Sequence, residues 1–186
     1  MTQWLITPHR PSDLESIVAL VNSAYRGDSA EVGWTHESDY VDGQRTSLAD
    51  LQGELAAEPA PKLLVVRQEA GGEIIACVMI ERLVDADGGV AGYIGMLTVH
   101  PARQADGLGR MVLAAAEDQA RADGAMRARM TVVSIRDTLI AWYERRGYRL
   151  TGETRPFPYE DGRFGAPRVP DLKFVVLEKP LTDASE

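Results

Sequence analysis

The sequence is poor in cysteine and histidine, the residues that most often bind transition metals or form covalent cross-links. Its 186 residues include one cysteine, Cys77, and three histidines that lie far apart, His9, His36 and His100. A single cysteine excludes an internal disulfide, and the histidine spacing matches no metal-binding motif. Because Cys77 lies in an apolar run, we expect it to pack in the core of a protein from a reducing compartment, without a metal.

The sequence also lacks a long hydrophobic run. No stretch of apolar residues approaches the roughly 20 that a membrane-spanning helix needs. The first ten residues have neither a charged segment nor a long apolar core, so they are not expected to form a signal peptide. We therefore expect a cytoplasmic protein without a membrane partner.

Positive charge is in deficit. The chain has 20 Lys and Arg against 28 Asp and Glu, a formal net charge of −8. This balance argues against nonspecific nucleic-acid binding through a broad basic face. It would suit a cationic small-molecule partner, although most acidic proteins are acidic only for solubility.

Length and composition predict one domain over residues 1–186, with a disordered tail from about residue 180. Apolar periodicity and turn residues predict seven strands and four helices in the order β-α-α-β-β-β-α-β-α-β-β. A capping box at Ser12–Glu15 would begin the first helix, and Gly124 and Gly147 would end the third and fourth. The predicted strands cover residues 4–7, 62–68, 74–82, 93–99, 127–133, 148–152 and 172–177, and the helices residues 12–25, 47–59, 108–123 and 137–146.

The most informative segment joins the strand 93–99 to the helix that begins at Leu108. It contains Gln104, Gly107 and Gly109, and glycines at a strand-to-helix turn let backbone N–H groups approach an anion at the helix N-terminus. The segment lacks the Lys-Ser/Thr ending of a Walker loop and the three glycines of the dinucleotide fingerprint. A phosphate-binding turn and an ordinary tight turn both remain compatible with this segment alone.

The spacing Gln104-x-x-Gly107-x-Gly109, preceded by Val99 and Pro101, resembles the acyl-CoA-binding motif of the GNAT superfamily of N-acetyltransferases. The resemblance implies the acyl-CoA N-acyltransferase fold, an α/β (α+β) architecture with a mixed central sheet of about six to seven strands and flanking helices. It implies acetyl-CoA as cosubstrate, with its pyrophosphate bound by Gln104, Ala105, Asp106, Gly107, Leu108, Gly109 and Arg110. Ala105 departs from the motif, which often has glycine there, but alanine can still donate its N–H.

A second resemblance lies at the end of the fourth predicted helix. Ala141, Tyr143, Gly147 and Tyr148 match the superfamily pattern Ala-x-Tyr-x-x-x-Gly-aromatic, in which the tyrosine protonates the departing thiolate. Tyr143 is therefore the expected general acid, a role typically worth 10²–10⁴ in rate. The alternative is that Tyr143 is one more aromatic residue on a buried helix face.

The resemblance also implies that the strand before the glycine turn carries a bulge and diverges from the next parallel strand to admit the pantetheine arm. Gly95 is the expected bulge site, and the backbone of Leu97 and Val99 would bind the cofactor, with the Leu97 N–H polarising the thioester carbonyl. Arg136 stands where many members have asparagine. It would either pair with the pyrophosphate or be a solvated helix-start residue.

The general base and the acceptor site are less well defined by the sequence. Glu81, Glu31 and Glu37 are candidate bases, and a chain of water molecules is the alternative. Aromatic residues of two loops, 26–45 and 153–170, are expected to form the acceptor site: Trp34, Phe157 and Tyr159. Together with nearby glutamates they would suit a cationic or amphipathic amine, unless they only hold long loops against the body.

These expectations combine into an N-acetyltransferase that acts by direct transfer, with a small-molecule or peptide amine as acceptor and a second copy of the chain as a candidate partner. The alternative is a non-catalytic acyl-CoA-binding sensor domain on the same fold. A purely structural or interaction domain is the third hypothesis.

Overall fold

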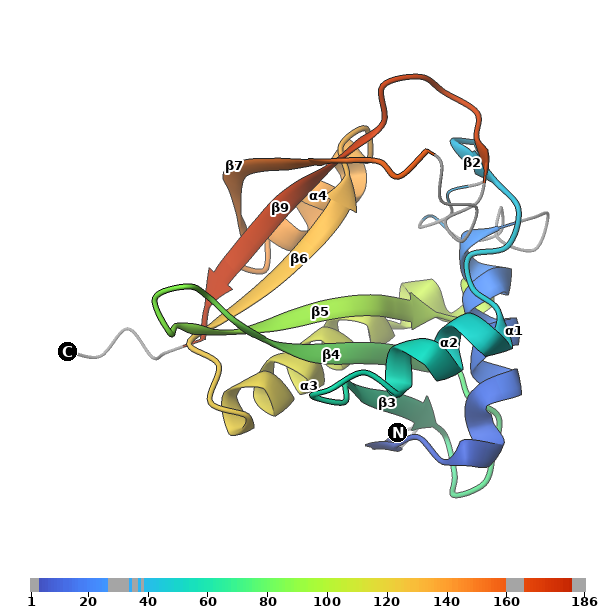
Figure 1. Cartoon of the computed structure of the whole chain (residues 1–186). Helices are drawn as coiled ribbons and strands as arrows, with labels where there is room; N and C mark the ends of the chain where they lie inside the picture. The colour runs from blue at the N-terminus through green and yellow to red at the C-terminus, as the bar shows by residue number, and fades with distance from the viewer. Residues whose placement is uncertain (1–3, 27–33, 35–36, 38, 160–165, 182–186) are drawn as a thin grey trace.

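The computed structural model describes residues 4–26, 34, 37, 39–159 and 166–181. Within these residues, seven strands form one mixed sheet in the order β1-β3-β4-β5-β6-β9-β7, and two short strands, β2 and β8, form a second sheet (Figure 1). The strands of the large sheet are Leu5–Pro8 (β1), Lys62–Arg67 (β3), Ala76–Val84 (β4), Val90–Val99 (β5), Arg127–Val133 (β6), Arg149–Pro156 (β7) and Lys173–Pro180 (β9). The other elements are Val41–Asp42 (β2), Ala166–Pro167 (β8), the α-helices Leu14–Tyr25 (α1), Leu48–Leu55 (α2), Leu108–Ala122 (α3) and Asp137–Glu144 (α4), and the 3-10 helices Pro11–Asp13 (η1) and Pro101–Asp106 (η3). The expected mixed sheet with flanking helices is confirmed.

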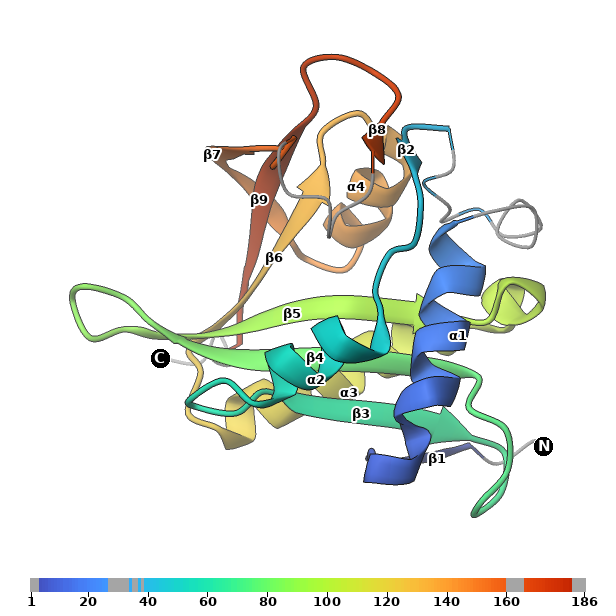
Figure 2. The same ribbon diagram turned by 45° about the vertical axis from the view of Figure 1, so that its right-hand side comes forward.

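The sheet is covered on both faces, which explains why its inner strands are almost continuously apolar. Alternate residues of β3 and β4 enter two cores: Leu64 and Val78 pack in the cluster that contains α3, and Leu63 and Cys77 in the cluster that contains α1 and α2. Figure 2 shows α1 and α2 in front of these strands and α3 behind them. Cys77 is fully buried, as expected for a core residue, and burial raises the pKa of its thiol to about 12.

The strand before the glycine turn carries the expected bulge. Cys77 of β4 pairs with Thr98 of β5 but Met79 pairs with Gly95, so two residues of β5, Met96 and Leu97, lie opposite one residue of β4. The bulge therefore lies one residue beyond Gly95, and Met96 adopts a left-handed conformation, with φ of 50°.

From Ile94 onward, before the bulge, β5 separates from its parallel neighbour β6. The two strands pair only from Ala91 to Tyr93, against Arg127 to Arg129. Figure 1 shows them meeting near the end of β9 and opening toward α1. This opening produces the space between β5 and β6 in which the candidate site lies.

Most predicted elements are present, with ends that differ by a few residues, and Gly124 and Gly147 follow α3 and α4 in left-handed conformations. The capping box at Ser12 was wrong. Asp13 is the N-cap of α1, and its carboxylate accepts a hydrogen bond of 2.7 Å from the Arg10 backbone and pairs with Arg67. The pairing of β2 with β8 was not predicted, because it joins two segments assigned to loops.

Candidate active site

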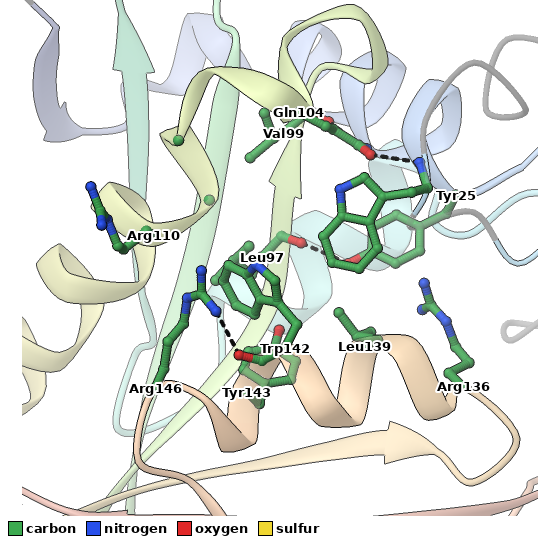
Figure 3. A pocket seen from close by; sticks show the side chains of 13 residues that line it. Tyr25, Leu97, Val99, Gln104, Arg110, Arg136, Leu139, Trp142, Tyr143 and Arg146 are labelled. Atoms are coloured by element: carbon green, nitrogen blue, oxygen red, sulfur yellow. Dashed lines mark hydrogen bonds between the residues drawn. The ribbon is translucent and has the colours of Figure 1, made fainter.

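A cavity of about 300 Å³ lies between β5, the N-terminus of α3 and helix α4 (Figure 3). We call it the α3 cavity. Several of the residues predicted to bind a cofactor line it, together with aromatic and basic residues of α4. Its lining consists of Tyr25, Trp34, Leu97, Val99, Gln104, Gly107, Gly109, Arg110, Arg136, Leu139, Trp142, Tyr143 and Arg146.

The glycine turn has the geometry of an anion site. Gly107 is left-handed, with φ of 77°, and is the N-cap of α3 without a side-chain hydrogen bond. The first helical bond runs from Met111 N–H to the Gly107 carbonyl, so the amides of Leu108, Gly109 and Arg110 have no acceptor within the helix. Such amides, with the helix dipole behind them, bind phosphate groups well.

At Gly107 the left-handed backbone favours glycine, whereas at Gly109 the close approach of the Trp142 ring does. A Cβ atom on Gly109 would lie 3.4 Å from the Trp142 ring, tighter than most real contacts, whereas a Cβ on Gly107 would meet nothing within 4 Å. Three of the residues predicted to bind cofactor, Ala105, Asp106 and Leu108, do not line the cavity. The Leu108 side chain is buried in the core and Asp106 pairs with Arg103, so only their backbone atoms could meet a ligand.

Gln104 joins the turn to the loop of Trp34. Its Nε2 donates to the Val99 carbonyl at 3.3 Å, and its Oε1 accepts a hydrogen bond of 2.9 Å from the Trp34 N–H. The Trp34 ring lies 6.2 Å from the ring of Trp142. Trp34 therefore lies on the α3 cavity, beside the glycine turn.

Tyr143 is buried on α4 and contacts both Trp142 and Tyr148 edge-on, at centroid distances of 5.0 and 5.7 Å. Burial raises its pKa well above the ordinary value of 10, so the phenol stays protonated. Its hydroxyl makes no hydrogen bond to any described residue. Two neighbouring tyrosines do: Tyr25 donates to the Leu97 carbonyl at 2.7 Å, and Tyr148 donates to Glu117 at 3.0 Å.

Tyr25 was not predicted to be a site residue, because its position fits the apolar repeat of α1. The structure shows that it holds the bulge of β5 through Leu97 and lines the cavity (Figure 3). Burial raises its pKa, and the nearby charge of Glu37 raises it further. Only the contact between the end of α1 and β5 reveals this role.

Trp142 and Arg146 were also missed as individual site residues. The Arg146 guanidinium lies 3.5 Å from the centre of the Trp142 ring and donates a hydrogen bond of 2.6 Å to the Trp142 carbonyl. Its Nε is buried and has no hydrogen-bond partner among the described residues. Arg110 lies on the same side of the cavity (Figure 3). Two guanidinium groups and a helix N-terminus therefore surround one end of the α3 cavity.

A second cavity, of about 400 Å³, occupies the opening between β5 and β6, and we call it the β6 cavity. It shares Tyr25, Leu97, Arg136, Leu139 and Tyr143 with the α3 cavity, so the two cavities meet beside the Tyr143 side chain. Apart from these five, its lining consists of Arg26, Glu37, Arg45, Tyr93, Ile94, Gly95, Met96, Met130, Thr131, Val132, Val133, Arg155, Pro156, Phe157, Pro158 and Phe174.

Charged groups of the β6 cavity are mostly basic. Glu37 accepts from Arg26 at Oε2 and from Arg136 at Oε1, both at 3.1 Å. Arg136 is buried at the start of α4, so the expectation of a solvated helix-start residue was wrong. The Arg45 guanidinium lies 5.7 Å from the centre of the Tyr25 ring.

The structure brings two of the three expected acceptor residues together: the ring centroids of Phe157 and Tyr159 are 5.5 Å apart. Phe157 is buried against Phe174, at a centroid distance of 5.4 Å, and lines the β6 cavity. Tyr159 lines neither cavity, and its hydroxyl accepts from the Leu172 N–H at 2.6 Å and donates to the Val169 carbonyl. Trp34 lies on the α3 cavity and Phe157 on the β6 cavity, so no described cavity is lined by all three residues, and an acceptor site between their two loops stays a prediction.

The candidate bases lie in different places, and neither Glu81 nor Glu37 offers a free carboxylate oxygen in a cavity. Glu81 lies on β4 opposite Tyr93 and lines neither cavity; burial, and then the charge of Glu54, raise its pKa. Both oxygens of Glu37 are taken by arginines. Glu31 lies outside the described residues. In the described part of the chain, no group of three His, Cys, Asp or Glu residues could hold a metal, and no helix is long and apolar enough to cross a membrane.

Comparisons with known proteins agree with this geometry. The profile of the Acetyltransferase (GNAT) family matches residues 17–148. An IAA acetyltransferase of Azospirillum brasilense is 31% identical over 143 residues, which cover 77% of this chain and 82% of that protein.

Solved structures share the fold at low sequence identity. The ribosomal-protein-S18-alanine N-acetyltransferase of Escherichia coli has a TM-score of 0.65 at 17% identity, covering 99% of this chain and 97% of its own. The yncA protein of Salmonella typhimurium, solved with its cofactor acetyl-CoA, has a TM-score of 0.68 at 18% identity, covering 98% and 96%.

Proposed function

The chain belongs to the Acetyltransferase (GNAT) family, whose cosubstrate is acetyl-CoA, and from this premise we propose that it acetylates a primary amine by direct attack, with Tyr143 as general acid. The observation that carries the proposal is the position of Tyr143. It lies where the α3 and β6 cavities meet, and its hydroxyl has no hydrogen-bond partner among the described residues.

The α3 cavity fits the cosubstrate. The amides of Leu108, Gly109 and Arg110 would hold the pyrophosphate, and the guanidinium groups of Arg110 and Arg146 would add charge-assisted hydrogen bonds. The diverging backbone at Leu97 and Val99 would meet the pantetheine amides. The buried, unpartnered Nε of Arg146 supports an anion at this end of the cavity.

The β6 cavity would take the acceptor. Tyr143 lines both this cavity and the α3 cavity, so amine and thioester would meet at that residue. Phe157 remains part of this proposed acceptor site, whereas Trp34 would contact the cosubstrate. Glu81 and Tyr159 are not proposed as acceptor contacts, because they line neither cavity.

Acetyl-CoA supplies the thioester whose carbonyl carbon is attacked. The amine nitrogen forms the new C–N bond as the C–S bond breaks, and the Tyr143 hydroxyl gives its proton to the departing sulfur. The proton lost by the nitrogen passes through water and restores the Tyr143 phenol, so that each turnover yields an amide and a thiol. Water is the proposed base, because Glu37 is the only carboxylate among the described residues that line the two cavities and both its oxygens are occupied.

The raised pKa of Tyr143 is compatible with this role. Proton transfer depends on the difference between the pKa of the donor and that of the acceptor. Burial raises the pKa of a thiol as well, as Cys77 shows with a value of about 12. A thiolate that leaves beside Tyr143 in a dry site therefore also binds a proton more tightly than in water.

The test is Tyr143→Phe, with Tyr148→Phe as the matched control. Both remove one buried hydroxyl near the end of α4, but Tyr148 lines neither cavity. We expect Tyr143→Phe to keep CoA binding and lower kcat by about 10²-fold or more, while Tyr148→Phe changes kcat less than about threefold. A wild-type kcat in Tyr143→Phe would contradict the general-acid role and leave Tyr143 as a residue of the packed core. CoA binding without turnover of any amine by the wild type would support the sensor alternative.

Cosubstrate binding has its own test. Gly109→Asp places a side chain against Trp142 and a negative charge beside the proposed pyrophosphate site. We expect calorimetry to show CoA affinity reduced at least about tenfold, or 1.4 kcal/mol. Gly53→Asp on α2, where a Cβ meets nothing within 4 Å, is the control for an added aspartate. Unchanged CoA affinity in folded Gly109→Asp would contradict the placement.

A further inference from the structure

The β6 cavity opposes the charge of the protein as a whole. Among the described residues, four guanidinium groups line it, from Arg26, Arg45, Arg136 and Arg155, against one carboxylate, from Glu37, although the chain carries a net charge of −8. A local excess of one sign in a cavity attracts ligands of the opposite sign and disfavours ligands of the same sign.

From this charge pattern we infer that the acceptor carries an anionic oxygen group, a carboxylate or a similar oxyanion, a few bonds from its amine, and that Arg45 binds that group. The inference rests on the proposed function, because it assigns the acceptor to the β6 cavity. It replaces the cationic amine suggested by the overall charge.

Arg45 differs from the other three arginines in its partners. Arg26 and Arg136 both pair with Glu37, and Arg26 also donates to the Val41 carbonyl at 2.8 Å. Arg155 pairs with Glu153 at 3.0 Å. No carboxylate in the described part of the chain pairs with Arg45, whose guanidinium lies over the Tyr25 ring. A half-buried guanidinium without a carboxylate partner can form a charge-assisted hydrogen bond with an anionic group of a ligand.

The positions of Arg45, Tyr25 and Tyr143 predict the orientation of the bound acceptor. Tyr25 lies under the Arg45 guanidinium and also lines the α3 cavity beside Tyr143. An acceptor whose amine meets the thioester at Tyr143 can therefore place its anionic group toward Arg45. Phe157 and Phe174 form an apolar wall of the same cavity, which suits an apolar side chain.

These features together describe an α-amino acid or a closely similar molecule with an apolar side chain. A polyamine would bring further positive charge to a basic cavity. A peptide N-terminus would lack the nearby anion. The cosubstrate phosphates are a separate anion source, but the uncapped N-terminus of α3 lies on the other cavity.

The experiment compares amino acids with the amines that lack their carboxylate: L-phenylalanine with 2-phenylethylamine, L-tryptophan with tryptamine, and L-methionine with 3-(methylthio)propylamine. In the wild type we expect kcat/KM to be at least about tenfold higher for the better amino acids than for the matched amines. In Arg45→Gln we expect this preference to disappear through acceptor KM, with the KM for acetyl-CoA unchanged. Arg82→Gln, an exposed position on β4 away from both cavities, removes the same charge and should keep the preference. Equal or better use of the amines by the wild type, or a preference that survives Arg45→Gln, would overturn the inference.

A binding measurement separates this inference from the proposed catalysis. Calorimetry of 3-phenylpropanoate and 3-phenylpropanol against the protein saturated with CoA needs no turnover. We expect the carboxylate to bind at least about tenfold more tightly than the alcohol, and this difference to vanish in Arg45→Gln. Carboxylate binding without acetylation of any pair would support the inference and count against the proposed catalysis. Acetylation of amines with equal binding of 3-phenylpropanoate and 3-phenylpropanol would support the proposed catalysis and count against the inference.

Discussion

Two buried carboxylates, Glu117 and Glu37, differ in the balance of charge around them. Glu117 on α3 accepts from the Tyr148 hydroxyl at 3.0 Å and pairs with Lys179 of β9 at 2.7 Å. Glu37 lies between two arginines, with Arg45 as a further cation in the same cavity. Arg121 also lies 4.0 Å from Glu117 and pairs with Asp118 at 2.5 Å, so two carboxylates face two basic groups in this cluster. Among the described residues around Glu37, positive charges are in excess.

The difference separates a cluster that holds the fold together from one prepared for a ligand. The Glu117 cluster joins α3, the turn after α4 and strand β9, and it lines neither cavity. Its charges are satisfied internally. The Glu37 cluster lies on the β6 cavity, and its excess charge is satisfied only when an anion arrives. Substitutions in the two clusters should therefore have different consequences.

Glu117→Ala should produce the largest effect on stability. It leaves Lys179 and the Tyr148 hydroxyl without their partner, and breaking a buried pair by removing one member costs about 3 kcal/mol. Tm should fall by about 6–12 °C. Asp118→Ala on the same helix, whose side chain is 77% exposed, is the control and should stay within about 0.5 kcal/mol. Thermal unfolding measures both, and a small loss in Glu117→Ala would contradict a structural role for this cluster.

Glu37→Gln should destabilise the protein by a somewhat smaller amount, about 2 kcal/mol, because the amide keeps one acceptor for the two arginines but loses the charge. An added anion should substitute for the lost carboxylate of Glu37, and this effect distinguishes the Glu37 cluster from the Glu117 cluster. Sulfate at about five times its Kd would return about 1 kcal/mol. We expect the rise in Tm from sodium chloride to sodium sulfate, at equal ionic strength, to be larger in Glu37→Gln than in the wild type. In Glu117→Gln the rise should equal that of the wild type, and equal rises in all three proteins would remove the distinction.

The contrast also shows what the sequence could and could not predict. Local signals were sufficient for most of the helices and for the glycine turn, because periodicity and spacing lie within one segment. The role of Tyr143 stays a prediction. The bulge was placed one residue too early, since the Leu97 carbonyl is held by Tyr25 from α1. The cap of α1 was displaced because Asp13 has a partner in β3, Arg67.

The acceptor site could not be predicted, because its charge belongs to no single segment. Arg26, Arg45, Arg136 and Arg155 lie far apart in the sequence, and the overall charge of −8 has the opposite sign. The aromatic residues of the loops were the visible signal, and they led to one correct cavity residue, Phe157, and to Tyr159, which contacts its own loop. A cavity built where distant strands diverge is a property of the fold.

High pH should destabilise both regions through their buried tyrosines. Burial raises the pKa of Tyr148, and so does its hydrogen bond to Glu117; burial also raises the pKa of Tyr25 and Tyr143. A raised folded-state pKa gives stability that is complete below pH 10 and is lost as the pH rises further, by up to about 1.4 kcal/mol per pH unit for each tyrosine. Urea unfolding between pH 9 and 11 should show this decline. Tyr148→Phe should reduce the slope of the free energy of unfolding against pH by the equivalent of about one proton. An unchanged slope in that variant would mean that Tyr148 does not titrate differently in the two states.

The smallest expected effect is on the stability of Arg45→Gln, and it completes the contrast between the two clusters. A cation that stabilises the fold, such as Lys179, loses an ion pair when it is neutralised, and Lys179→Gln should cost about 1–2 kcal/mol. Arg45 has no such pair among the described residues, so its charge contributes little to the fold and adds to the repulsion among the arginines of the β6 cavity. We expect the free energy of unfolding of Arg45→Gln to stay within about 0.5 kcal/mol of the wild type, measured by urea unfolding without added anions. With 3-phenylpropanoate and CoA present, the wild type should gain stability and Arg45→Gln should gain less, because only the wild type offers the carboxylate a guanidinium. A loss as large as that of Lys179→Gln, with equal gains from the ligand in both proteins, would place Arg45 among the residues that hold the fold.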